Sequence, residues 1–372
     1  MRFTCNRQQL ADMLTLLAEA VPSRTPHPIL QNILLEAPDP EDGMPVGRIK
    51  LSATDQEIGI RHWLETTQLE PGGKALLPAQ RLTAIVREDR SNEITVSISD
   101  YVAKIQTDKF KYTLIGQPGD AFPALPDMPG EGHFEIAGDD VAEAGAKTIF
   151  AAARAGDSRY ALNGVLVSVA ADRCEFVASD THRLSCVTKR VRNADGVEAD
   201  GIVLTKGFLA LERMAARRET VALCLTGKHL MAWTSDAFLA VRLVEGQFPR
   251  YKEVIPQNLD RRISVNREEF AMRLRNLGVM ANEESRIIVM ESMGEDCLVV
   301  STGSEAGDGR TEMEAVIKGG DIKVAYDYLY LLELLKAIPS EDTVTFQLRE
   351  GDVPSRVDCG DLVHVLVPRR QG

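Results

Sequence analysis

Apolar residues along the chain follow two spacings, and the same order of spacings occurs three times. Near the N-terminus, a strand-like alternation over 1–5 precedes apolar residues at helical spacing, which predict an amphipathic helix over about 8–19. Asn6 has the position and the side chain of the N-cap of this helix. Alternating segments then predict strands, and a second helix is expected from Pro78, because proline is favoured in the first helical turn.

This order of elements returns at a nearly constant spacing. The first strands of the three repeats contain Phe3, Phe134 and Ile263, which lie about 130 residues apart. Proline-rich segments at 119–129 and 246–256 are typical of linkers. We therefore expect three domains of one α+β fold, each with two helices packed on antiparallel sheets. Their expected bounds are 1–126 for the N-terminal, 130–256 for the central and 260–372 for the C-terminal domain.

The composition narrows the class of protein. No apolar run approaches the roughly 20 residues of a membrane span. The N-terminal MRFTCNRQQL lacks the apolar core of a signal peptide, which predicts a cytoplasmic location. The six cysteines are scattered without a C-x-x-C pair, so buried, reduced thiols are expected. The six histidines do not cluster, and neither a metal nor a cofactor is expected.

The net charge of −12 argues against binding of nucleic acid over the whole protein surface, but it is compatible with binding at one locally basic face. In two predicted helices of the middle repeat, cations fall opposite the apolar stripe: Lys147 and Arg154 in one, and Lys206, Arg213 and Arg217 in the other. These side chains are either ordinary solvated cations or a binding face. Because aromatic residues make up only 5% of the chain, a binding face would suit duplex phosphates better than single strands or base edges.

The segment 158–184 distinguishes the middle repeat from the other two. It predicts two strands that are followed by an exposed run of polar residues, Asp180-Thr181-His182-Arg183, which we call the polar tetrad. The corresponding positions of the first and third repeats, 54–57 and 302–305, have different residues. A function that is not shared by the three repeats is therefore expected at the tetrad.

Three motifs of the middle repeat resemble those of one known family. RYALNG at 159–164, ASDTHRL at 178–184 and EGQFPRY at 245–251, followed by VIP at 254–256, are similar to the bacterial DNA polymerase III beta subunit, the sliding clamp. The resemblance covers the whole chain in order, including the repeats and linkers. It implies a head-to-tail homodimeric ring in which this chain forms half. Such a ring encircles duplex DNA regardless of sequence and is not an enzyme.

The resemblance also implies partners and assigns residues to sites. The partners would be the replicative polymerase, a clamp loader and other replication and repair proteins, and no membrane is involved. Residues approaching DNA would be Arg24, Tyr160 and Lys206. An apolar pocket for partner peptides, with the tetrad at its rim, would consist of Leu162, Thr181, His182, Arg183, Leu184, Pro249, Val254, Pro354, Val365, Val367 and Pro368. In the dimer interface, an edge strand with Tyr112 and Leu114 would meet Val279 and Met280.

The chain departs from the family pattern at three places. Thr181 stands where the family usually has glycine, and Ala161 where it often has a second aromatic residue. The C-terminal sequence VPRRQG at 367–372 replaces a methionine-rich end, which removes an adaptable wall of the pocket and bears on its shape and peptide preference.

Two other functions are compatible with parts of the sequence. The chain could be a scaffold of repeated domains that holds partner peptides without binding nucleic acid. Ser179, Asp180 and His182 could also belong to a hydrolase, although no second carboxylate or nucleophile elbow accompanies them.

Overall fold

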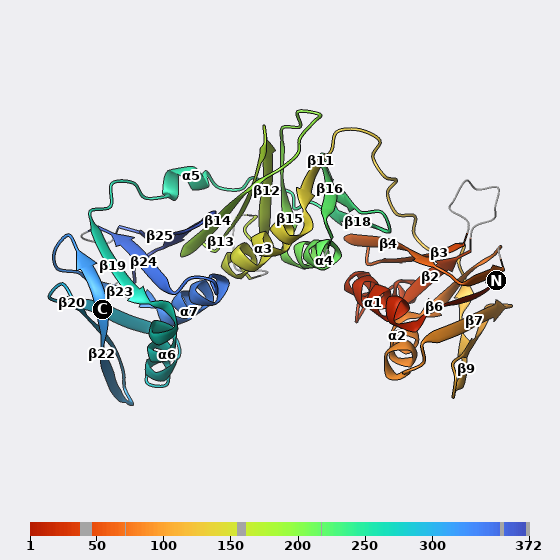
Figure 1. The fold of residues 1–372 in the computed structure, drawn as a ribbon, viewed down its shortest axis with the longest axis horizontal. Coiled ribbons are helices and arrows are strands. Elements are labelled where there is room, and N and C mark those ends of the chain that lie inside the picture. Colours follow the sequence, from red (N-terminus) through yellow and green to blue (C-terminus); the bar gives the residue numbers. More distant parts are fainter. Residues whose placement is uncertain (38–46, 71, 155–160, 217, 350–352, 370–372) are drawn as a thin grey trace. The chain divides into compact units, whose positions relative to one another are not determined.

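The computed structural model describes residues 1–37, 47–70, 72–154, 161–216, 218–349 and 353–369 (Figure 1). The chain divides into two compact units. Unit 1 comprises Met1–Ala142 and Val191–Leu243, and unit 2 comprises Glu143–Arg190 and Val244–Gly372. The middle repeat therefore contributes residues to both units. Among the described residues, no helix is long and apolar enough to cross a bilayer.

The N-terminal repeat begins as its pattern predicts. Strand β1 (Arg2–Asn6) leads into helix α1 (Arg7–Leu17), and the side chain of Asn6 accepts a hydrogen bond of 3.0 Å from the amide of Gln9, which confirms the predicted N-cap. The last predicted residues of this helix form a separate 3₁₀ turn, η1 (Ala18–Ala20). β1 lies inside an antiparallel sheet with the order β5-β1-β7-β8-β9. The other strands are β5 (Gln68–Glu70), β7 (Glu93–Ser99), β8 (Val102–Gln106) and β9 (Lys111–Ile115).

A second sheet of unit 1 joins strands of the first and middle repeats. Its order is β10-β6-β2-β3-β4-β18-β17-β16-β11, and the repeats meet where β4 pairs with β18, with Ile60 opposite Leu239. Its strands are β2 (Asn32–Glu36), β3 (Arg48–Thr54), β4 (Ile58–Glu65), β6 (Lys74–Pro78), β10 (Gln117–Pro118), β11 (Phe134–Ala137), β16 (Thr220–Leu225), β17 (His229–Trp233) and β18 (Ala237–Arg242).

The helices of unit 1 pack their predicted apolar faces against strands. Unit 1 contains α2 (Ala79–Glu88) and α4 (Thr205–Ala215), strand β15 (Ala199–Leu204), and the start of α3 (Gly138–Thr148). Phe208 and Leu211 of α4 are fully buried, as their spacing predicts. α4 lies so close to β18 that a Cβ atom on Gly207 would be 2.3 Å from Cγ1 of Val241. Glycine is therefore required there for space rather than for its backbone freedom.

In unit 2, as in unit 1, strands of two sequence repeats pair to form one continuous sheet. Its sheet runs β12-β13-β14-β26-β25-β24-β19-β22-β21-β20-β23, and the middle and C-terminal repeats meet where β14 pairs with β26, with Leu184 opposite Val365. Its strands are β12 (Gly164–Ala170), β13 (Arg173–Ser179), β14 (Arg183–Arg190), β19 (Arg261–Asn266), β20 (Ile287–Met293), β21 (Cys297–Ser304), β22 (Gly307–Lys318), β23 (Lys323–Asp327), β24 (Thr343–Leu348), β25 (Ser355–Cys359) and β26 (Leu362–Leu366).

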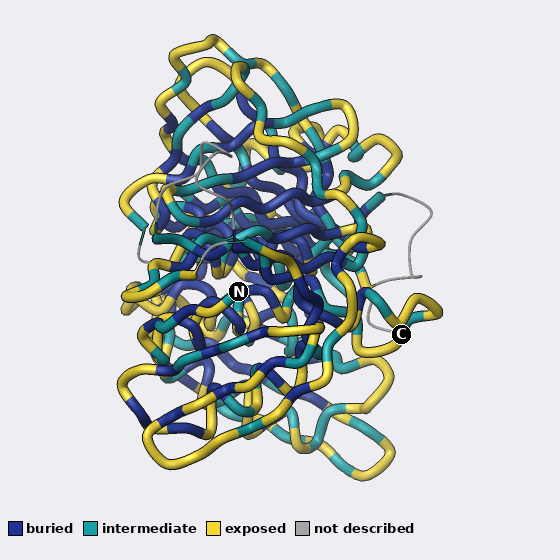
Figure 2. The backbone as a smooth tube through the Cα atoms, turned by 90° about the vertical axis from the view of Figure 1, so that its right-hand side faces the viewer, coloured by how far each residue is buried: buried dark blue, intermediate teal, exposed yellow. Residues whose placement is uncertain are grey.

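The helices of unit 2 also follow the sequence pattern. The side chain of Asn266 accepts a hydrogen bond of 2.9 Å from the amide of Glu269, which confirms the predicted cap of α6 (Arg267–Gly278). The other helices are the 3₁₀ turn η4 (Ile149–Ala151), the short α5 (Tyr251–Val254) and α7 (Tyr328–Ala337). Buried residues follow the strands and exposed ones the connecting turns (Figure 2). Two longer helices for each repeat and antiparallel sheets confirm the predicted α+β class.

Candidate functional site

The polar tetrad forms a tight turn between β13 and β14. The carboxylate of Asp180 accepts hydrogen bonds of 3.0 Å from the amides of both His182 and Arg183, and the hydroxyl of Ser179 accepts one of 3.2 Å from the amide of Thr181. Asp and Ser side chains stabilise turns in this way because they replace backbone acceptors. The turn gives Thr181 a φ of 75°, a left-handed conformation that is strained for a β-branched residue.

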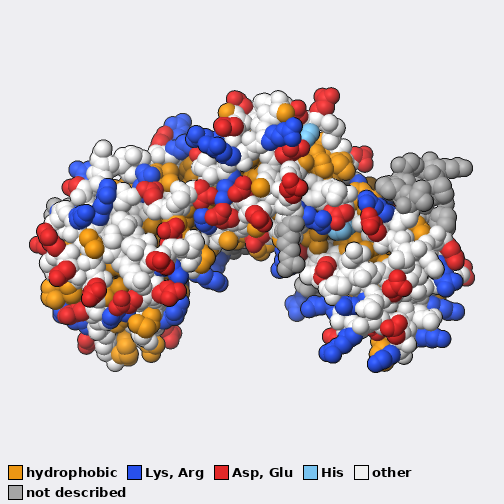
Figure 3. Space-filling model, viewed as in Figure 1, with side chains coloured by type: hydrophobic (Ala, Val, Ile, Leu, Met, Phe, Trp, Pro, Cys, Tyr) orange, Lys and Arg blue, Asp and Glu red, His pale blue; other side chains and the backbone are white. Residues whose placement is uncertain are grey.

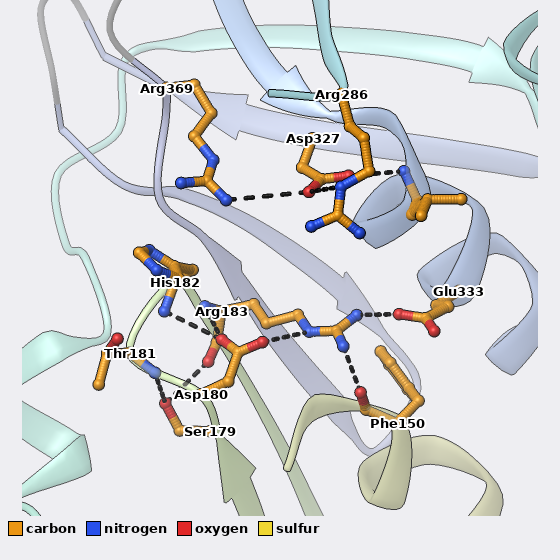
Figure 4. Close-up of polar contacts among 11 residues, drawn as sticks. Phe150, Ser179, Asp180, Thr181, His182, Arg183, Arg286, Asp327, Glu333 and Arg369 are labelled. Atoms are coloured by element: carbon orange, nitrogen blue, oxygen red, sulfur yellow. Dashed lines mark hydrogen bonds and ion pairs between the residues drawn. The ribbon is translucent and has the colours of Figure 1, made fainter. Parts of the chain in front are cut away.

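The expectation that the whole tetrad is exposed is wrong for Asp180, which is half-buried, and for Arg183. Thr181 and His182 are exposed, but Arg183 is 7% exposed. Its guanidinium group binds Asp180 at 3.1 Å, Glu333 and the carbonyl oxygen of Phe150 (Figure 4). It also lies 4.1 Å from the ring centroid of Tyr330. A planar cation with five donors can be buried when carboxylates, a carbonyl and aromatic faces surround it.

A cavity of about 710 Å³ lies beside this arginine in unit 2, within the usual range for ligand pockets. It is bounded by the β13–β14 turn, the end of η4 and the start of α7. The lining residues are Phe150, Ala152, Ala153, Arg154, Asp180, Thr181, His182, Arg183, Arg286, Leu329, Tyr330, Glu333 and Arg369. Its wall therefore contains four arginines and two carboxylates.

A buried carboxylate organises two of these arginines. The side chain of Asp327 is fully buried and accepts a hydrogen bond of 3.0 Å from the amide of Leu329, which caps α7. The guanidinium groups of Arg286 and Arg369 approach this carboxylate from different sides, at 3.3 and 3.8 Å (Figure 4). Burial raises the pKa of the Asp327 carboxyl, although the amide of Leu329 and the arginines act in the opposite direction.

Comparison with known proteins assigns the family. The N-terminal, central and C-terminal domain models of the DNA polymerase III beta subunit match residues 1–126, 135–250 and 252–359. The chain belongs to the DNA polymerase III beta subunit family. These matched ranges resemble the predicted domains, whose bounds stay predictions.

Relatives along the whole chain agree with this assignment. The beta sliding clamp of Synechococcus elongatus is 30% identical over 364 residues, which cover 95% of this chain and 94% of that protein. The beta sliding clamp of Pseudomonas aeruginosa is 26% identical over 375 residues and is matched over the full length of both chains. A crystal structure of the P. aeruginosa DNA polymerase III subunit beta matches with a TM-score of 0.90 over 100% of each chain, at 26% identity. A second structure from that organism, bound to griselimycin, has a TM-score of 0.91 at 26% identity.

The family assignment settles the function in outline. The chain is a DNA sliding clamp, a processivity factor of the DNA polymerase. This confirms the function predicted from the resemblance. Because the clamp is a non-catalytic subunit, the hydrolase alternative is wrong. Because a sliding clamp acts on DNA, the alternative of a scaffold that does not bind nucleic acid is wrong as well.

The structure brings some of the predicted pocket residues together and buries others. Thr181, His182 and Arg183 line the cavity, and the amide of Val367 donates a hydrogen bond of 2.9 Å to the carbonyl of His182. Leu162, Leu184 and Val365 are buried in the core of unit 2, Pro249, Pro354, Val367 and Pro368 are half-buried, and Val254 is 50% exposed. No sequence motif pointed to Phe150, Arg286, Tyr330 or Glu333, because they come from distant segments without a shared spacing. Arg369 was noticeable only as part of the unusual C-terminal sequence.

The two cations predicted on the first basic helix face have different surroundings. Lys147 was expected to face solvent, and this is wrong: it is 8% exposed, binds Asp361 at 2.8 Å and also pairs with Glu143. Lys189 joins the same cluster, 2.5 Å from Asp361. Burial alone would raise the pKa of the Asp361 carboxyl, but the two lysines outweigh burial and lower it. Arg154 is exposed but lies beyond α3, in the cavity wall.

On the second predicted basic helix, α4, Lys206 and Arg213 are exposed as their spacing predicts. The side chains of Lys206 and Arg213 on α4 are 49% and 52% exposed, and they pair with Asp55 and Glu19 of the first repeat. Arg24 is exposed as well. Tyr160 and Arg217 lie outside the described residues. Acidic and basic side chains are interspersed over the face seen in Figure 3. Contact with DNA stays a prediction for all of these residues.

The predicted dimer residues lie in two regions that expose apolar side chains. Strand β9 is an open edge of its sheet, where Phe110 and Ile115 are 53% and 75% exposed and Tyr112 is half-buried. Leu114 is buried in unit 1, and its place in a dimer interface stays a prediction. Next to the end of α6, Val279 is 82% exposed and Met280 half-buried. Open strand edges and exposed apolar side chains are typical of interaction surfaces.

Proposed function

We propose that this clamp holds its partner proteins through short peptides that bind at the cavity beside the polar tetrad. The observation that carries this proposal is the cavity itself. Thr181 and His182 are exposed at its edge, while the buried Arg183 holds the turn rigidly against Glu333 and Phe150. A preformed concave site limits the entropy that a flexible peptide loses on binding. Griselimycin bound to the relative from P. aeruginosa supports a ligand site on clamps of this fold.

Griselimycin is a suitable probe of this site. We expect it to bind the wild-type protein in isothermal titration calorimetry, and His182→Asp to weaken binding about tenfold, because a charge at the rim of a site must be desolvated. His27→Asp is the matched control, since His27 is exposed in the other unit. Equal affinities for the two variants, or no binding to the wild type, would contradict the proposed pocket.

We further propose that two chains form a head-to-tail ring around duplex DNA. The exposed apolar edge at β9 and the exposed Val279 supply two different surfaces of the kind that a head-to-tail dimer needs. The protein is expected to sediment at roughly twice its monomer mass of 40.9 kDa. Val279→Glu should yield monomers at micromolar concentration, whereas Val316→Glu, at an exposed valine of β22, should not. A wild-type monomer would argue against the ring.

The cations of α4 are proposed to face the enclosed DNA. Contacts between lysine or arginine and phosphate are independent of sequence and weaken with salt. In the presence of a clamp loader, circular DNA should retain the protein and linearised DNA should release it, because a ring is held by topology. The double change Lys206→Glu and Arg213→Glu should reduce loading, and Arg310→Glu, an exposed cation of β22, should not. Equal retention on linear DNA would disprove topological binding.

A further inference from the structure

We propose that Asp55 and Glu19 weaken the attraction between helix α4 and duplex DNA, so that the closed ring stays mobile on it. The inference rests on the proposed ring and on the proposed DNA face of α4. It gives a role to two carboxylates of the first repeat, which lie beside the two basic side chains of this helix, Lys206 and Arg213.

The turn between β3 and β4 fixes the carboxylate of Asp55. Its Oδ1 accepts hydrogen bonds of 3.0 and 2.7 Å from the amides two and three positions later. In the middle repeat, Asp180 makes the same two bonds, and its second oxygen binds Arg183. Ile58 stands at the position of Arg183 and carries no charge. The second oxygen of Asp55 pairs instead with Lys206 at the start of α4.

Arg213 is paired in a similar way, seven residues further along α4. Its Nη1 binds the carboxylate of Glu19, which belongs to the 3₁₀ turn η1. Asp55 and Glu19 come from the first repeat and α4 from the middle repeat, so both ion pairs cross the junction where β4 pairs with β18. Each basic side chain of α4 is therefore matched by a carboxylate.

The two cations are open to solvent, and the two carboxylates lie deeper. The side chains of Lys206 and Arg213 are 49% and 52% exposed, whereas those of Asp55 and Glu19 are 9% and 19% exposed. A phosphate can therefore approach the cations without displacing the carboxylates. Lysine has three N–H donors and arginine has five, so donors remain for such a contact.

A paired cation attracts a phosphate less strongly than a free one. At a distance of several ångströms, the negative charge behind the cation cancels most of its field. The contacts between α4 and DNA would then act only at short range. This suits a ring that topology retains, because strong ionic contacts must break each time the ring moves along the duplex. Such contacts are not needed to prevent dissociation.

The double variant Asp55→Asn and Glu19→Gln tests the proposal, because it removes both negative charges and nearly preserves the shape of both side chains. An asparagine oxygen can still accept the two amide hydrogen bonds of the β3–β4 turn. The matched control is Glu70→Gln with Asp172→Asn. It changes the net charge by the same amount at two exposed ion pairs that do not involve α4.

Mobility is measured by single-molecule fluorescence, with labelled rings that a clamp loader has placed on stretched duplex DNA with blocked ends. At low salt, we expect the double variant to diffuse about tenfold more slowly than the wild type, and the control to diffuse like the wild type. The difference should shrink as added salt screens the cations. In fluorescence anisotropy with a short duplex, the slope of log K against log salt should steepen by up to about two, one for each released cation.

A double-mutant cycle shows whether the carboxylates act through these two cations. In a protein that carries Lys206→Gln and Arg213→Gln, the changes at Asp55 and Glu19 should alter the diffusion coefficient by less than about twofold. A tenfold slowing that persists without the cations would overturn the proposal, because another surface would then be the one that contacts DNA.

Three other results would also overturn it. Equal diffusion of the double variant and the wild type would show that the carboxylates do not weaken the contact, and a lower melting temperature beside it would limit the ion pairs to holding the repeats together. Equal slowing in the control would assign the effect to net charge. If circular DNA does not retain the wild type, the proposed ring fails, and this inference fails with it.

Discussion

A buried histidine in unit 2 is expected to make the clamp less stable in mild acid. His364 lies on β26 between Ser185 of β14 and Val357 of β25, and it is completely buried. Its ring stacks on Phe150 at 5.6 Å, and neither ring nitrogen has a hydrogen-bond partner among the described residues. Burial lowers the pKa of His364 to about 3, and the positive charge of Arg183 acts in the same direction.

The size of the effect follows from proton linkage. An unfolded histidine has a pKa of about 6.5, so between this pH and about 3 the unfolded chain binds a proton that the folded chain does not. Stability that depends on the neutral ring is therefore complete above pH 6.5 and decreases as the pH falls. Each unit of pH changes the free energy of unfolding by about 1.4 kcal/mol, which amounts to about 2 kcal/mol at pH 5. For a unit of this size, the melting temperature should fall by about 4–8 °C.

The variant His364→Leu isolates this contribution, because it fills the site with an apolar side chain that cannot titrate. We expect thermal melts followed by circular dichroism to show a smaller loss between pH 7 and pH 5 in this variant than in the wild type. At pH 7 the variant should be as stable as the wild type or more so, since it removes two buried nitrogens without partners. His27→Leu, at an exposed histidine, serves as the control. Equal losses in the wild type and His364→Leu would refute the reasoning.

Three further changes test other parts of the structure. Asp361→Asn removes one carboxylate partner of the buried Lys147 and should destabilise unit 2 by about 3 kcal/mol, which hydrogen exchange of β14 and β26 can measure. Asp358→Asn is the control: it breaks an exposed ion pair and should lower the free energy of unfolding by less than about 1 kcal/mol. Thr181→Gly should relieve the strained φ and stabilise the tetrad turn by up to about 1 kcal/mol, so a lower melting temperature would contradict the assigned conformation. Gly207→Ala should lower the melting temperature through its contact with Val241, by about 1–3 kcal/mol in unfolding free energy, and a neutral result would show that α4 can move away from β18.

Local sequence determined the elements and their caps. Asn6 and Asn266 cap α1 and α6 because a side chain and an amide three residues later meet in any helix that starts there. The apolar stripe of α4 predicted its buried face, because the backbone of a helix imposes this periodicity. The similar spacing of the first strands predicted the repeats, because it reflects one domain that recurs along the sequence. The family motifs extended this to function, because they lie in continuous segments around 159–164, 178–184 and 245–251.

Tertiary structure alone decided which charges are buried and which residues form the cavity. Periodicity shows that Lys147 points away from the apolar stripe of its own helix, but not that the hairpin of another repeat brings Asp361 to that side. Arg183 carries a charge and is therefore expected at the surface, yet Glu333 and Tyr330 of α7 bury it. The arginines of the cavity come from segments far apart in the chain, and only the pairing of β14 with β26 brings those segments together. Such neighbours depend on strand order between repeats, which no local pattern encodes.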